Sequence, residues 1–239
     1  MQTQRQKTRT RWLDRIAILS GTLLVAGVLG GWLRLLPAIV AFYLFGLGGI
    51  VSTGLAIIFL IRRFRQHALG FPGGFACVAA AAFIASATLG SGDAPPTNDF
   101  TTDLDDPPTF TNARTLADNL GRDLSYPAEY RVVQEQCCSD LRPQTFQEDP
   151  DQVLNALASV AAKMPGWTII GVSSNRGTIE AVATSILFGF KDDIVIRVQP
   201  SELGSLVDVR SKSREGKSDL GANAARIRAF QNSARAELP

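Results

Sequence analysis

Three long apolar runs lie in the first 92 residues of the chain, and they restrict its fold more than any other feature of the sequence. Residues 16–33, 35–61 and 71–89 carry no charged side chain, and a helix of about 20 apolar residues can cross the hydrocarbon core of a bilayer. The sequence therefore predicts a membrane domain, residues 1–92, with three transmembrane helices. A cleaved signal peptide is the alternative for the first run, but a second apolar run follows almost at once and no clean small-residue cleavage site separates them.

Basic residues next to these runs predict how the chain crosses the membrane. The N-terminal tail up to Arg15 carries five of them, and residues 62–65 carry three. Both segments should be cytoplasmic by the positive-inside rule. Three crossings then place the C-terminal part on the other side. We therefore expect a multi-pass protein of the inner (cytoplasmic) membrane, with a cytoplasmic N-terminus and an extracytoplasmic domain, which is periplasmic in a cell with two membranes.

Charge divides the chain in the same way. Residues 1–92 hold nine basic side chains and one acidic one, whereas residues 93–239 hold 15 basic and 21 acidic ones. The expected partners are the lipid bilayer and, for the acidic C-terminal part, a membrane or periplasmic protein or a small anion. Nucleic-acid binding is not expected, because the basic tail is short and adjoins a membrane run.

Histidine and cysteine are scarce, which restricts the chemistry of the C-terminal part. His67 is the only histidine and falls in the loop before the third apolar run, where a solvated side chain is the simplest interpretation. A Ser-His-Asp apparatus or a histidine-ligated zinc site is therefore excluded from the C-terminal part, and we predict no metal and no cofactor. Cys137 and Cys138 are adjacent and could pair, stay free or bind a soft metal together with another chain.

Residues 93–126 are rich in Asp, Pro, Thr and Asn, which predicts an extended leader rather than a packed element. Its acidic run, Asp99, Asp103, Asp105 and Asp106, has two interpretations. The carboxylates could hold a divalent cation, or the run could be a solvated linker that docks on the domain. The second is favoured, because the spacing is not that of an EF-hand loop.

The remaining residues, 127–239, predict an α+β domain. Asp149 can cap a helix that has Pro150 in its first turn and ends at Pro165-Gly166. Strands are expected over residues 167–172, 178–188, 193–199 and 206–211, and a last helix should begin near Ser218 or Asp219. Its inner face is expected to hold Leu220, Ala224, Ile227 and Phe230. Short connections require antiparallel pairing, which gives a four-stranded sheet with two helices, in the order α-β-β-β-β-α.

Carboxylates, guanidiniums and small hydroxyls gather on the third and fourth predicted strands and on the segment that follows them. Strand periodicity puts Arg197, Asp208 and Arg210 on the face opposite the helices, if the helices cover the isoleucine and valine face. The loop after the fourth strand brings Arg214 to the start of the last helix, where an anion can bind. The candidate ligand-binding residues are Asp192, Asp193, Arg197, Asp208, Arg210, Ser211, Arg214, Asp219, Asn223 and Arg226.

The same residues carry a family resemblance. Residues 101–108, 189–193, 210–214 and 218–227 resemble, in order, the characteristic blocks of the family called domain of unknown function 1499. The resemblance extends over about residues 98–236. It implies that the polar residues matter, but it implies no particular activity.

Three hypotheses follow for function. The preferred one is a membrane-anchored, extracytoplasmic domain that binds a partner protein or a small anion through the Arg210 and Arg214 loop. The second is an enzyme that uses Asp192 and Asp193 with Arg210, although adjacent strand residues point to opposite faces and make a poor catalytic pair. The third is a scaffold in which the polar cluster is purely structural. No residue is assigned a catalytic role.

Overall fold

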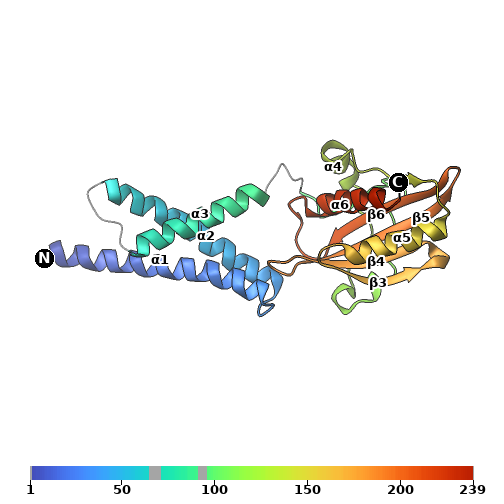
Figure 1. Ribbon diagram of the computed structural model, residues 1–239. Helices are drawn as coiled ribbons and strands as arrows, with labels where there is room; N and C mark the ends of the chain where they lie inside the picture. Colours follow the sequence, from blue (N-terminus) through green and yellow to red (C-terminus); the bar gives the residue numbers. More distant parts are fainter. Residues whose placement is uncertain (1, 65–70, 91–95, 239) are drawn as a thin grey trace. The chain divides into compact units, whose positions relative to one another are not determined.

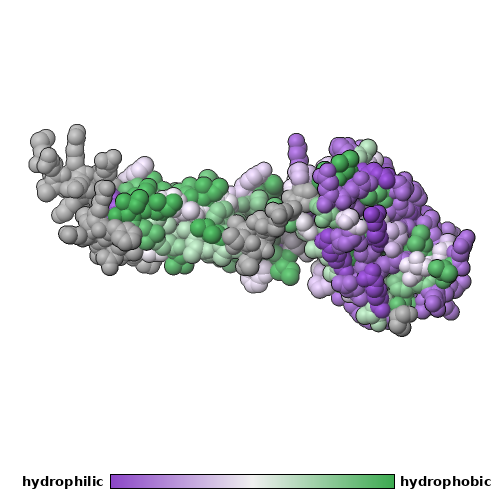
Figure 2. Space-filling view, turned by 90° about the horizontal axis from the view of Figure 1, so that it is seen from above, coloured by the Kyte–Doolittle hydropathy of each residue, from purple (hydrophilic) through white to green (hydrophobic). Residues whose placement is uncertain are grey.

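The computed structural model describes residues 2–64, 71–90 and 96–238, so His67 and Arg65 lie outside the described residues (Figure 1). Contacts divide the chain into two compact units. The first comprises residues 1–91 with 186–189, and the second comprises residues 92–185 with 190–239. Hydrophobic residues cover most of the described helical surface, whereas the surface of the second unit is largely hydrophilic (Figure 2).

The first unit consists of three helices, α1 (Gln2–Trp32), α2 (Ala38–Phe64) and α3 (Phe71–Gly90). Glycines bring α1 and α2 close together. A Cβ atom added at Gly27 would lie 2.5 Å from the backbone nitrogen of Phe45, and one at Gly48 would lie 2.5 Å from that of Leu24. Small residues allow such close approach between membrane helices. The lack of a side chain at Gly27 and Gly48 therefore lets α1 and α2 pack closely.

Two of these helices are long and apolar enough to cross a membrane, over Trp12–Trp32 and Ala38–Arg62, within the part of the chain that the structure describes. The prediction of three transmembrane helices is therefore wrong. Helix α3 forms where the third was expected, but its apolar stretch is shorter, Pro72–Ser86. At 1.5 Å per residue this stretch spans only ~22 Å, less than the ~30 Å of hydrocarbon. The first helix lies near the N-terminus, a position that a signal sequence shares.

The second unit contains one antiparallel sheet of six strands, in the order β1-β6-β5-β4-β3, with β2 also paired to β6. The strands are β1 (Asp99–Thr101), β2 (Gln144–Phe146), β3 (Trp167–Ser173), β4 (Thr178–Thr184), β5 (Lys191–Ser201) and β6 (Gly204–Ser213). The four predicted strands correspond to β3 to β6, so antiparallel pairing is confirmed. The expectation of only four strands is wrong, because β1 and β2 have three residues each and are too short to show an alternating pattern.

Helices α5 (Pro150–Lys163) and α6 (Ala222–Glu237) cover one face of the sheet (Figure 1), and α4 (Tyr130–Cys137) is an additional short helix. The carboxylate of Asp149 accepts a hydrogen bond from the backbone of Asp151, which confirms the predicted cap. Ala224, Ile227 and Phe230 are buried in the core, as expected. Leu220 is exposed instead, because it has a positive φ of 55° and precedes the helix.

The opposite face of the sheet, called the polar face below, is covered by residues 97–126, called the cover segment below. Its strand β1 pairs with β6, and Phe110 and Leu124 pack with Val195 in a second apolar cluster. The expectation of an extended leader rather than a packed element is therefore wrong for these residues. The acidic and proline-rich composition is typical of a linker, and it does not reveal that the polar groups have partners on the sheet.

The number of crossings can be tested by topology mapping. If only α1 and α2 cross the bilayer, the two chain ends lie on the same side, because an even number of crossings returns the chain to its starting side. We expect protease added to sealed membrane vesicles to cut epitope tags at both ends, or neither. Cleavage of one tag with protection of the other would show that α3 also crosses, and would restore the topology predicted from three spans.

Candidate functional site

The sheet separates the ten candidate residues into two clusters. Paired neighbours on adjacent antiparallel strands share a face, and β5 pairs with β6 so that Arg197 lies opposite Asp208 and Asp192 lies opposite Ser213. Asp193, Arg197, Asp208, Arg210 and Arg214 belong to the polar face. Asp192, Ser211, Asp219, Asn223 and Arg226 belong to the face that α5 and α6 cover. The candidates therefore do not form a single site.

On the helix side, Arg226 connects α6 to the sheet. Its guanidinium lies 2.6 Å from the carboxylate of Asp192 and donates to the hydroxyl of Ser211 at 3.1 Å. The side-chain amide of Asn223 donates to the Ser213 hydroxyl at 2.9 Å. These groups are buried or nearly so and bind one another. This cluster fixes the start of α6 against the ends of β5 and β6.

The start of α6, where an anion was expected to bind, is occupied by a carboxylate of the chain itself. Asp219 accepts hydrogen bonds from the backbone nitrogens of Gly221 at 2.9 Å and Asn223 at 2.7 Å. Burial raises the pKa of Asp219 despite these bonds. An external anion would have to displace this side chain.

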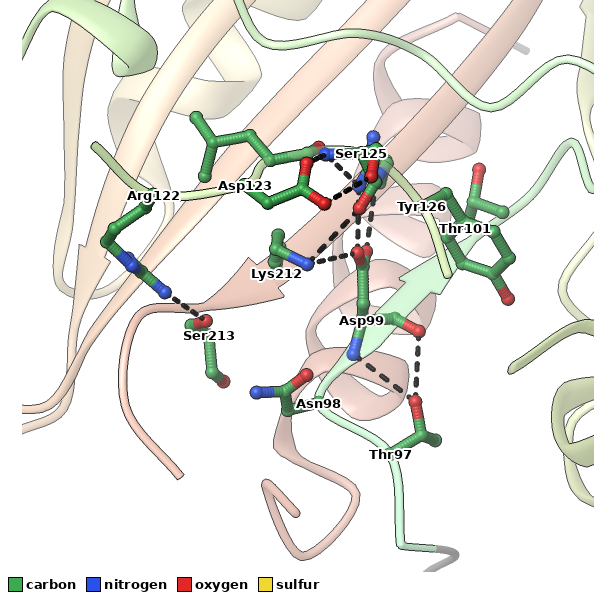
Figure 3. Close-up of polar contacts among 12 residues, drawn as sticks. Thr97, Asn98, Asp99, Thr101, Arg122, Asp123, Ser125, Tyr126, Lys212 and Ser213 are labelled. Carbon is green, nitrogen blue, oxygen red and sulfur yellow. Dashed lines mark hydrogen bonds and ion pairs between the residues drawn. The ribbon is translucent and has the colours of Figure 1, made fainter. Parts of the chain in front are cut away.

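On the polar face, Arg210 and Asp99 form a buried ion pair (Figure 3 shows the surroundings of Asp99). The Nε and Nη2 atoms of Arg210 donate to the two carboxylate oxygens of Asp99 at 3.0 and 2.8 Å, and the Arg210 side chain is 1% exposed. Lys212 donates to the same carboxylate at 2.9 Å. Arg210 also donates to the backbone carbonyls of Pro108 and Leu124. The cover segment is thus bound to β6 by paired and hydrogen-bonded charges.

Arg197 is surrounded by three carboxylates. It lies 3.0 Å from Asp208 on β6, 3.2 Å from Asp103 and 2.7 Å from Asp106 in the cover segment. Burial raises the pKa of Asp208, and Arg197 acts in the opposite direction. The predicted cross-strand pairing on the face opposite the helices is confirmed for Arg197 and Asp208. That face is covered, however, and does not present an open charged patch.

Arg214 is held in the same manner by Asp193 and Asp118. Its Nη2 atom lies 2.6 Å from Asp193, and its Nη1 atom lies 2.9 Å from Asp118. Asn119 also donates to Asp193, at 2.8 Å. The hydrogen bond from Lys191 lowers the pKa of Asp118. The acidic run and its neighbours therefore bind arginine and lysine side chains.

Asp192 and Asp193 face opposite sides of the sheet, as strand periodicity predicts. Asp192 contacts Arg226 from α6, whereas Asp193 contacts Arg214 and the cover segment. A reaction that requires both carboxylates at one reacting atom cannot use them in this arrangement.

Glu180 is a buried residue that the candidate residues did not include. Its carboxylate accepts hydrogen bonds from the backbone nitrogens of Thr111, Asn112 and Ala113, at 2.8 to 3.1 Å. Glu180 stands alone as a charge within the apolar strand β4, and that isolation is the signal that could have identified it. It fixes the middle of the cover segment to the sheet.

A cavity of about 440 Å³ opens beside Arg210, and we call it the Arg114 cavity. Its walls come from residues 104–114 of the cover segment and from residues 124–131. They include the rings of Phe110 and Tyr126, whose centroids lie 4.9 and 5.5 Å from the Arg210 guanidinium carbon. The Arg114 side chain is exposed and forms no ion pair with a described residue, although its charge acts on Asp123, whose pKa is lowered mainly by hydrogen bonds from Ser125 and also by Arg114.

Cys137 is exposed, Cys138 is buried, and both are free thiols, as is Cys77. No group of three or more histidine, cysteine, aspartate or glutamate side chains is placed to hold a metal ion within the described ranges. The divalent-cation interpretation of the acidic run is replaced by the arginine and lysine contacts given above.

Fold and site together define an α+β domain that follows an apolar helical unit. The chain belongs to the family described as "Protein of unknown function (DUF1499)", whose model matches residues 99–233. The match begins at the first residue of β1 and therefore includes almost all of the cover segment. No curated protein matches the chain. A crystal structure of the protein MLL2253 from Mesorhizobium loti is 10% identical over 40% of this chain and 92% of that one, with a TM-score of 0.33, which supports no conclusion about function.

The structural role of the Arg210 cluster can be tested by unfolding. Replacement Arg210→Ala leaves the buried Asp99 with Lys212 alone, and removal of one partner from a buried pair costs about 3–5 kcal/mol. We expect that loss in the free energy of unfolding, measured by pulse proteolysis of the full-length chain in detergent with increasing urea.

Arg228→Ala is the matched control, because Arg228 pairs with Asp140 at the surface, where the side chains are 40% and 56% exposed. Exposed pairs contribute about 0–1 kcal/mol. Equal losses for the two variants, or no loss for Arg210→Ala, would show that the buried cluster does not stabilise the domain.

Proposed function

We propose that this chain is a membrane-anchored domain that binds a small anionic ligand in the Arg114 cavity. The proposal rests on which arginines form ion pairs with carboxylates of the chain and which do not. Arg210 and Arg214 are held by carboxylates of the same chain, whereas Arg114 lines a cavity and has no ion-pair partner among the described residues. A free guanidinium at an open cavity is available to a ligand, and a paired, buried one is not.

The cavity has both of the features that a small-molecule site requires. Its volume falls within the ~300–1,000 Å³ range of ligand pockets. Aromatic rings of Phe110 and Tyr126 supply apolar surface, and Arg114 and Arg131 supply positive charge. Arg131 is partly neutralised by Asp105 and Glu135, which leaves Arg114 as the principal anion-binding group.

Arg210 also lines the cavity. A guanidinium has five N–H donors, and four of those of Arg210 are used by Asp99, Pro108 and Leu124. The Arg210 side chain is also only 1% exposed, so in this proposal it shapes the cavity wall and does not bind the ligand. The combination of Arg114 and the aromatic rings favours a molecule with a carboxylate or phosphate group and a compact apolar or aromatic part.

In this proposal, α1 and α2 anchor the chain in the membrane. Both are apolar over the length of a bilayer, and glycines pack them closely together. With two crossings, the expected periplasmic location loses its basis, because it required an odd number of spans. The binding proposal does not depend on which side of the membrane the domain occupies.

Binding can be measured through thermal stability, since a ligand that binds only the folded state raises the unfolding midpoint. Inorganic phosphate and benzoate would be titrated into the full-length chain in lipid nanodiscs, with sodium chloride at equal ionic strength as the reference. We expect a saturable rise in the calorimetric midpoint with at least one of these anions.

Two variants assign the effect to the cavity. Arg114→Gln should abolish the rise, whereas Arg142→Gln, which removes another exposed arginine without an ion pair in the described structure, should keep it. The proposal fails if neither anion shifts the midpoint, or if Arg114→Gln responds like the unmodified chain.

A further inference from the structure

The two adjacent cysteines of the second unit lie at the end of helix α4, whose last residue is Cys137. The backbone carbonyl of Gln134, one turn earlier, contacts both of them. It accepts a hydrogen bond from the backbone nitrogen of Cys138 at 2.9 Å, and the thiol of Cys137 donates to it at 3.8 Å. The end of the helix therefore holds both cysteines at one point of the backbone.

The two thiols differ in exposure, and they interact with each other. Cys137 is exposed, whereas Cys138 is 6% exposed and packs in the main hydrophobic core. Partial burial of its sulfur and a hydrogen bond with the Cys138 side chain raise the pKa of the Cys137 thiol to about 12. That hydrogen bond requires the two sulfurs to lie close together. One sulfur is thus open to a reagent, and the second lies next to it.

Helix α6 adds a cation to the pair. The pKa of Arg228 is raised mainly by its hydrogen bonds to Asp140, and also by Cys138, so its guanidinium lies near this cysteine. Thiolates are the sulfur species that bond to thiophilic centres, and neighbouring positive charge stabilises them. The surroundings of the pair therefore favour bonding through sulfur.

The number of available ligands decides which centre fits. Structural zinc takes four protein ligands, and no group of three or more histidine, cysteine, aspartate or glutamate side chains is placed to hold an ion within residues 2–64, 71–90 and 96–238. A trivalent arsenic atom that carries an organic group bonds to two sulfurs and needs no further protein ligand. Soft thiolate sulfur also suits such a centre better than carboxylate or amide oxygen does.

We propose that Cys137 and Cys138 form a dithiol site that chelates trivalent organoarsenicals. With phenylarsine oxide, two As–S bonds form, the bond between arsenic and oxygen breaks, and the two thiol protons leave with that oxygen as one molecule of water. Arsenic remains trivalent, so the step needs no oxidant or reductant. The site goes beyond the proposed function and depends neither on the Arg114 cavity nor on membrane anchoring.

The test uses the full-length chain in lipid nanodiscs, reduced with a phosphine and carrying Cys77→Ala, so that only the two adjacent thiols remain. Excess phenylarsine oxide is added, and intact-mass spectrometry follows the adduct. We expect one arsenical per chain, with both thiols protected from N-ethylmaleimide. Excess 2-mercaptoethanol should leave the adduct in place, whereas 2,3-dimercaptopropanol should remove it, because a chelate yields to a competing dithiol and not to a monothiol.

Two variants that retain a single thiol are the matched controls. Cys137→Ser changes an exposed side chain, which keeps the test independent of the core, and Cys138→Ala removes the other sulfur. Both should lose the adduct when 2-mercaptoethanol is added. The inference is overturned if the reduced chain takes up no arsenical or two of them, if 2-mercaptoethanol removes the adduct from the chain with both thiols, or if Cys137→Ser retains it.

Discussion

The buried ion pair between Asp99 and Arg210 is the interaction on which the rest of the domain depends. Strand β6 carries Asp208, Arg210 and Lys212 on the polar face, where an uncompensated charge would cost several kcal/mol. Asp99 in β1 satisfies two of these three residues at once. The strand that supplies Asp99 must therefore pair with β6, and the cover segment follows it across the polar face.

This arrangement changes the role that can be assigned to the polar residues. Groups that resemble an anion-binding site in the sequence are mostly donors and acceptors for one another, across two clusters separated by the sheet. The same contacts shape the Arg114 cavity, because Pro108 and Leu124 accept hydrogen bonds from Arg210 at its base. A functional site can then lie beside the ion-pair network while the network keeps the cavity walls in place.

Much of the fold could be predicted from sequence because it depends on local patterns. The cap at Asp149, strands β3 to β6, their antiparallel pairing and the inner face of α6 follow from periodicity and turn residues. The cover segment could not be predicted in this way, because Asp99 and Arg210 are 111 residues apart and the composition between residues 97 and 126 is typical of a linker. Glu180 was missed for the same reason, since its partners are backbone groups about 70 residues away.

Native-state hydrogen exchange of the full-length chain tests this account most directly. The amides of Thr111, Asn112 and Ala113 bind Glu180, and those of Ile194 and Ile196 lie in the central strand β5. If the cover segment is part of the cooperative fold, both groups should exchange with the same free energy of opening, that of global unfolding. Rapid exchange at residues 111–113 with full protection of β5 would show instead that the segment detaches on its own, and would contradict the central claim.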